Sequence, residues 1–188
     1  MGFARQTIEL NGCKLSLARG GKGVPLIYLH GTDGLAEWPA LLDTLAQRFD
    51  VIVPDHPGFG GSEAPAWIDD ISDLAYCYLD AIEALGLSGV HILGQSLGGW
   101  IALEMAVRST QRLRSLTLIS PAGIHVKGVR KADIFIIDPE EQARLAYAEA
   151  FHRLIPGSTL TMIPNAGHLP HVERASAVTE AIQAFLRN

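Results

Sequence analysis

The chain has 188 residues, of which 48% are hydrophobic and 19% charged, and its formal net charge is −5. This length predicts a single domain, residues 1–188, with a core large enough to need no disulfide or metal. The acidic balance and the lack of a basic cluster argue against a nucleic acid or a membrane surface as partner. The N-terminus has no apolar signal segment, and no apolar run reaches membrane-spanning length. We therefore expect a cytoplasmic protein.

The N-terminal part of the chain predicts four strands and one helix. Residues 6–19 alternate apolar and polar side chains around Asn11-Gly12, which predicts a β-hairpin. The short apolar runs at 25–29 and 51–53 predict buried strands, and residues 35–49 between them have apolar side chains at helical spacing. A strand, a helix and another strand in this order are typical of a parallel βαβ unit.

The rest of the chain continues the alternation. Asp69 or Asp70 is suited to cap a helix that stops at Gly86. Five further elements are predicted: strands over 90–93, 113–119 and 159–163, and helices over 100–107 and 139–154, before a C-terminal helix. The pattern predicts an α/β fold of three layers, a mostly parallel sheet with helices on both faces and an antiparallel N-terminal edge.

The segment 94–98 reads Gly-Gln-Ser-Leu-Gly and lies between a predicted strand and a predicted helix. This is the context in which G-x-S-x-G indicates a nucleophile elbow, a sharp turn that exposes a serine hydroxyl. Such a turn strains the backbone of Ser96, and the flanking glycines remove Cβ atoms that would clash. The start of the following helix favours negative charge near the serine. Ser96 is therefore the candidate nucleophile.

Four segments together resemble the α/β-hydrolase family: His30-Gly31 after a strand, the loop 54–60 after the next, the elbow at 94–98 and Gly167-His168. The resemblance covers nearly the whole chain. It implies a serine nucleophile, a histidine base and an acid, in the chain order Ser…Asp/Glu…His. On this basis Ser96 is the nucleophile and His168 is the base that takes its proton.

The resemblance also implies where the oxyanion of a tetrahedral intermediate would bind. Backbone N–H groups stabilise that charge best when they are fixed in advance. One donor would be Leu97, directly after the nucleophile, and the other Thr32, directly after His30-Gly31. The resemblance assigns Asp55 a structural role, and His171 a packing or hydrogen-bonding role.

The acid of the triad is the ambiguous member. Family members carry a lid after the strand that ends near Ile119, and then a strand with the acid, but this chain is too short for a lid of normal size. In one interpretation, residues 134–137 are that strand and Asp138 is the catalytic acid. In the other, residues 124–147 are a lid remnant, the acid-bearing strand is missing, and Asp138 only caps a helix. Both interpretations stay open at this stage.

These features predict a serine hydrolase of the esterase type that needs no cofactor and acts on a small ester or related acyl compound through an acyl-enzyme. A second hypothesis is a weakly active or silent scaffold of the same fold. A third is an enzyme that cleaves a C–C bond or a thioester with the same serine apparatus. His168 and His171 have no third ligand cluster near them in sequence, so no metal site is predicted.

Overall fold

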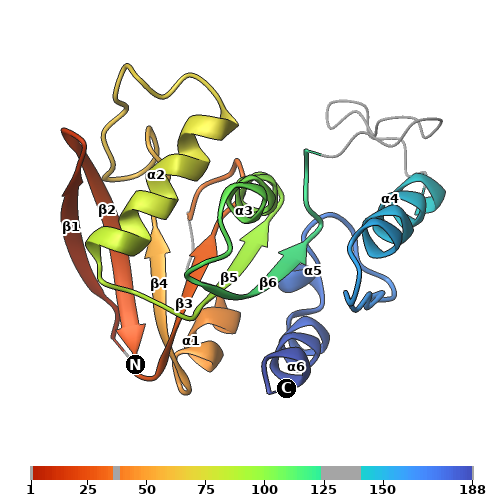
Figure 1. The fold of residues 1–188 in the computed structure, drawn as a ribbon. Coiled ribbons are helices and arrows are strands. Elements are labelled where there is room, and N and C mark those ends of the chain that lie inside the picture. The colour runs from red at the N-terminus through yellow and green to blue at the C-terminus, as the bar shows by residue number, and fades with distance from the viewer. Residues whose placement is uncertain (1, 36–38, 124–140, 188) are drawn as a thin grey trace.

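The computed structural model describes residues 2–35, 39–123 and 141–187. The described residues form six strands and six helices, which together make one α/β fold (Figure 1). The strands are β1 (Ala4–Leu10), β2 (Cys13–Gly21), β3 (Val24–Leu29), β4 (Phe49–Pro54), β5 (Val90–Gln95) and β6 (Leu113–Ile119). The helices are α1 (Ala40–Leu45), α2 (Ile71–Ala84), α3 (Leu97–Arg108), α4 (Glu141–Leu154), α5 (Pro170–Glu173) and α6 (Ala175–Leu186).

The six strands form one mixed sheet in the order β1-β2-β4-β3-β5-β6. The pairs β3–β4, β3–β5 and β5–β6 are parallel, while β1–β2 and β2–β4 are antiparallel. The hairpin turn falls at Asn11 and Gly12, whose φ angles of 51° and 74° suit a tight two-residue turn. The predicted mostly parallel sheet with an antiparallel N-terminal edge is confirmed.

The two faces of the sheet carry separate apolar clusters. Ile27 and Leu29 of β3 pack on one face with residues of α2 and α3, such as Ile82. Leu26 and Tyr28, the alternate residues of β3, pack on the other face with α1 and α6. Because successive side chains of a strand point to opposite faces, β3 is buried on both sides and the molecule has three layers (Figure 1).

Helix α2 begins as the sequence predicts. Asp70 is its N-cap, and the Asp70 carboxylate accepts a hydrogen bond from the Asp73 backbone N–H. The residue after the helix end, Gly86, has a φ of 63°, a conformation that favours glycine at helix C-termini.

The C-terminal part differs from the prediction in one element. Residues 159–163 form no strand in the described structure, and the sheet ends at β6. Leu160 and Met162 remain 36% and 53% exposed. Alternating β-forming residues make a strand only when a neighbour completes the hydrogen-bond ladder, and here no described strand does so. The predicted strand over 134–137 lies outside the described residues.

Candidate active site

Ser96 lies between the end of β5 and the first residue of α3, in a strained backbone conformation. Its φ and ψ are 50° and −112°, and its side chain is 9% exposed. A positive φ is uncommon for any residue other than glycine, and such strain concentrates at functional sites. The predicted elbow geometry is therefore present in the backbone of this chain.

The glycines around Ser96 let backbone segments approach each other too closely for any side chain. A Cβ atom on Gly98 would lie 2.1 Å from the carbonyl oxygen of Leu29 in β3, and one on Gly94 would lie 2.5 Å from the Gly98 carbonyl oxygen. Both clashes are with backbone atoms, which cannot rotate away. The start of α3 is thus held directly against the ends of β3 and β5.

Three backbone hydrogen bonds fix the elbow from the β6 side and from α3. The Ser96 N–H donates to the Ile119 carbonyl oxygen at 3.0 Å. The Ser96 carbonyl oxygen accepts from the N–H groups of Ala122 and Trp100, both at 3.1 Å. The segment after β6 is therefore hydrogen-bonded to Ser96 itself.

His168 reaches Ser96 across 72 positions of sequence. Its Nε2 atom lies 3.0 Å from the Ser96 Oγ atom, within hydrogen-bond distance. In this arrangement an unprotonated Nε2 can accept the hydroxyl proton, which is the geometry that a serine nucleophile and its base require. Of the predicted catalytic residues, the structure brings these two together.

The loop around His168 is held by a carboxylate that the sequence analysis did not single out. Glu173 accepts hydrogen bonds from the backbone N–H groups of Gly167 and Leu169, the two neighbours of His168. Short helix α5 begins at Pro170, whose missing N–H suits a first helical position. Glu173 lies in the first turn of α5, four residues after Leu169. An acidic residue at the start of a helix often accepts hydrogen bonds from nearby backbone N–H groups, and this position in the sequence could have identified it.

The other predicted site residues are distributed as follows. Leu97 is the first residue of α3 and directly follows Ser96. Thr32 lies in the turn after β3, two residues after His30, whose carbonyl oxygen accepts a hydrogen bond from the Gly98 N–H of α3 at 3.0 Å. Asp138 lies outside the described residues, as do 124–137 of the proposed lid remnant.

His171 is 6% exposed, and burial, together with nearby His168, lowers its pKa from the ordinary histidine value. Burial of this kind fits the packing role expected for His171.

Asp55 has structural partners. Its carboxylate accepts from the Arg5 guanidinium at 2.6 Å and from the Gly61 backbone N–H at 3.0 Å. Gly60 has a φ of 50°, and a Cβ there would lie 2.5 Å from the Asp55 carboxyl group. These contacts shape the loop after β4 and tie it to β1.

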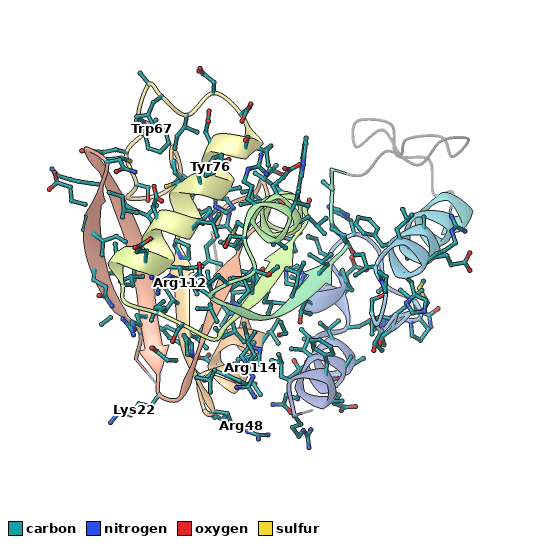
Figure 2. The ribbon with its side chains drawn as sticks, in the orientation of Figure 1. Lys22, Arg48, Trp67, Tyr76, Arg112 and Arg114 are labelled. Carbon is teal, nitrogen blue, oxygen red and sulfur yellow. The ribbon has the colours of Figure 1, made fainter. Side chains whose placement is uncertain are left out.

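Within the described ranges, no three or more His, Cys, Asp or Glu side chains gather as metal ligands would. In the same residues, no helix is both long and apolar enough to span a bilayer. The labelled cations Lys22 and Arg48 lie at the lower edge of the view in Figure 2, at the end of the sheet away from the start of α3.

The chain is similar to several known proteins. It is 36% identical over 125 residues to a 2-hydroxymuconate semialdehyde hydrolase of Pseudomonas sp. (strain CF600), an alignment covering 60% of this chain and 42% of that protein. It is 32% identical over 122 residues to a dihydrolipoyllysine-residue acetyltransferase component of an acetoin cleaving system from Cupriavidus necator, covering 64% and 33%. The chain thus spans well under half the length of either relative.

A solved structure shares the fold over the full chain. The crystal structure of a predicted CIB-like hydrolase from Thermoplasma acidophilum has a TM-score of 0.79 and 19% identity, covering 100% of this chain and 99% of that one. The family model described as alpha/beta hydrolase fold matches residues 24–135, more than half of the chain. With the elbow, the sheet order and this match in hand, the chain belongs to the α/β-hydrolase fold family.

Proposed function

We propose that this protein is a serine hydrolase of the esterase type that cleaves a small ester or related acyl compound through an acyl-enzyme. The observation that carries the proposal is the 3.0 Å separation of Ser96 Oγ and His168 Nε2, at a serine with a φ of 50°. A strained, glycine-flanked serine within reach of a histidine has a ready chemical use and no evident structural one.

The reaction follows from the roles of these two side chains. Ser96 Oγ attacks the acyl carbon while its proton passes to His168 Nε2, and the protonated His168 then donates that proton to the departing alcohol oxygen. Water next attacks the acyl-enzyme, again giving its proton to His168, and Ser96 leaves with the proton restored. The tetrahedral oxyanion of each step would be stabilised by the N–H groups of Leu97 and Thr32, the first at the positive end of α3.

The proposal assigns the third catalytic role to Asp138. To accept at Nε2, neutral His168 must carry its proton on Nδ1, and a carboxylate favours that tautomer. If Asp138 has this role, Asp138→Asn lowers kcat by up to about 10⁴-fold, as the corresponding change does in a serine protease. The matched control is Glu140→Gln, two residues further along the chain, for which we expect unchanged turnover. Equal, small effects of both variants would favour the helix-cap interpretation of Asp138.

Reaction with a fluorophosphonate tests the core of the proposal. The parent protein should gain the mass of one adduct, and Ser96→Ala should gain none while remaining folded. His168→Ala should slow the modification by about 10³-fold or more, because the hydroxyl then has no base. A folded parent protein that forms no adduct, or an adduct that survives in Ser96→Ala, would contradict the proposal and favour a silent scaffold.

A second candidate function is hydrolysis of a C–C bond by the same serine. It is favoured by the similarity to the 2-hydroxymuconate semialdehyde hydrolase, since the compound in that name contains no ester and its hydrolysis must break a carbon–carbon bond. Parallel assays with 4-nitrophenyl acetate and with 2-hydroxymuconate semialdehyde distinguish the two. The esterase proposal expects the higher kcat/KM for the ester.

A further inference from the structure

Three buried polar side chains form a connected group on the α2 side of the loop that follows β3. His30 is at the end of β3, His56 follows β4, and Tyr78 lies in α2. Their side chains are 1%, 0% and 1% exposed. Buried polar groups of this kind are costly unless hydrogen-bonded, and none of the three has a part in the proposed proton transfers. Their hydrogen bonds determine what the group does.

The hydrogen bonds of His56 determine which of its ring nitrogens carries a proton. Its Nε2 atom lies 2.9 Å from the His30 carbonyl oxygen, which can only accept, so Nε2 is the protonated nitrogen. Burial, with a further contribution from nearby His30, lowers the pKa of His56 to about 3, so its ring is neutral near pH 7. Its Nδ1 atom is then an acceptor, and its partner is the Tyr78 hydroxyl.

His30 is fixed in the opposite tautomer. The His56 backbone N–H donates to His30 Nε2 at 3.1 Å, so that nitrogen is unprotonated. His30 Nδ1 therefore carries the proton and donates to the Gly31 carbonyl oxygen at 2.7 Å. Burial lowers the pKa of His30 as well, which favours the neutral ring that this arrangement needs.

The Gly31 carbonyl and the Thr32 N–H belong to the same peptide plane. In a trans peptide these two groups point in opposite directions, so whatever holds the carbonyl also sets the direction of the N–H. The Gly34 N–H donates to the same Gly31 oxygen at 3.2 Å, and the His30 carbonyl accepts from the Gly98 N–H of α3 at 3.0 Å. The loop is thereby fixed relative to the elbow helix.

We propose that Tyr78 is a positioning residue: its hydroxyl holds His56 in one tautomer, and through His56 and His30 it orients the Thr32 N–H toward the oxyanion. This inference rests on the proposed function, in which Thr32 is an oxyanion donor. Without the hydroxyl, His56 has no donor for Nδ1. It can then protonate Nδ1 instead, which removes its hydrogen bond to the His30 carbonyl.

The test compares Tyr78→Phe with Tyr76→Phe, the same change two residues earlier in the same helix. Tyr76 is 53% exposed at the surface of α2 (Figure 2), where the Arg108 guanidinium lies 5.1 Å from its ring centroid. Deleting a whole oxyanion donor costs about 10²–10³-fold in kcat, so a misdirected donor should cost about tenfold. For Tyr78→Phe we expect this loss in kcat on 4-nitrophenyl acetate, with KM within about twofold of the parent value.

Two further readouts separate positioning from a general loss of structure. Rates are expressed per site titrated with fluorophosphonate, so an unfolded fraction lowers the number of sites and not kcat. A trifluoromethyl ketone, which forms an oxyanion on a serine, should bind Tyr78→Phe about tenfold more weakly, in parallel with kcat. Unchanged kcat and ketone affinity in Tyr78→Phe, or an equal loss in Tyr76→Phe, would overturn the proposal.

Nitrogen-15 NMR of histidine-labelled protein tests the tautomers without any substrate. We expect His56 protonated at Nε2 and His30 at Nδ1 in the neutral rings near pH 7, and a mixed His56 tautomer in Tyr78→Phe. The opposite tautomers in the parent protein would overturn the inference even if the protein is an active esterase. Failure of the proposed function is a separate result, namely the absence of Ser96-dependent labelling.

Discussion

Ser96 and His168 approach each other from two regions that are built differently. Ser96 sits where β3, β5 and α3 meet, and backbone contacts too close for a Cβ atom surround it. His168 is an exposed residue of a loop, held by Glu173 and by the packing of α6 against the α1 face of the sheet. Near that loop Met162 and Val172 are 53% and 62% exposed.

The two regions differ in which residues of the sequence determine their geometry. The elbow is specified locally, because the glycines of one pentapeptide permit its close backbone contacts. The position of His168 depends on residues distant in sequence, since Val178 and Ile182 of α6 are buried in the same cluster as residues of α1. A change in the first region should therefore disturb folding, whereas a change in the second should disturb the alignment of His168.

Gly98→Ala is expected to have the largest effect on stability. The added Cβ would lie 2.1 Å from the Leu29 carbonyl oxygen, a backbone atom that moves only with the sheet. Overpacking of this severity should lower the free energy of unfolding by about 3 kcal/mol or more, measured by urea denaturation. The control is Gly157→Ala in the C-terminal region, where φ is 75° but nothing lies within 4 Å, at about 1 kcal/mol. Equal losses would contradict the proposed contrast.

Val90→Ala and Val178→Ala make the same change in the two regions. Both side chains are buried, at 0% and 5% exposed, and each variant should lose about 2 kcal/mol. Only Val178→Ala should also slow fluorophosphonate modification of the folded protein, by about threefold or more, because α6 supports the loop of His168. If Val90→Ala slows labelling as much as Val178→Ala, then the alignment of His168 does not depend specifically on the packing of α6.

Acid should destabilise the region around His30 and His56. Their pKa values are lowered in the folded state, that of His56 to about 3, while an unfolded histidine titrates near 6.5. The unfolded chain therefore binds more protons between about pH 6.5 and about pH 3, and stability falls as the pH falls through that window. His56 should add a slope of up to about 1.4 kcal/mol per pH unit, measured from urea midpoints between about pH 7 and about pH 5.

The slope can be assigned to a residue by substitution. His56→Gln should reduce it by about one proton. A slope that His56→Gln does not change would mean that other groups dominate the acid response.

Met162→Ser should have the smallest effect. Its side chain is 53% exposed, in a segment that pairs with no described strand. The change in unfolding free energy should stay within about 0.5 kcal/mol, or about 2 °C in Tm. A loss comparable with that of Ile119→Ser in β6, where the side chain is 5% exposed, would show that residues 158–163 pack more firmly than these contacts indicate.

The parts of the fold predictable from sequence are those with local chemical signals. The Asn11-Gly12 turn, the Asp70 cap and the Ser96 elbow each need particular residue types at particular positions, and each is present as predicted. The approach of His168 to Ser96 was inferred from family resemblance, since no local signal relates residues 72 positions apart.

The parts that sequence did not predict depend on partners. Residues 159–163 have the composition of a strand, but a strand requires a neighbouring ladder. Tyr78 is a buried residue of α2, and the spacing of apolar residues along a helix indicates burial but not what a hydroxyl contacts. The tautomers of His30 and His56 follow only from seeing which carbonyl and which N–H face each ring.

The hydrogen bond from the Ala122 N–H to the Ser96 carbonyl oxygen, at 3.1 Å, bears on how this protein can be engineered. It means that Ala122, and with it the next residue, Gly123, lies beside Ser96. A segment grafted after Gly123 would start close to Ser96, while the glycine contacts and the β6 hydrogen bonds that shape the elbow lie before it in the chain. Libraries confined to that junction would vary residues next to Ser96 and leave the backbone of the elbow unchanged.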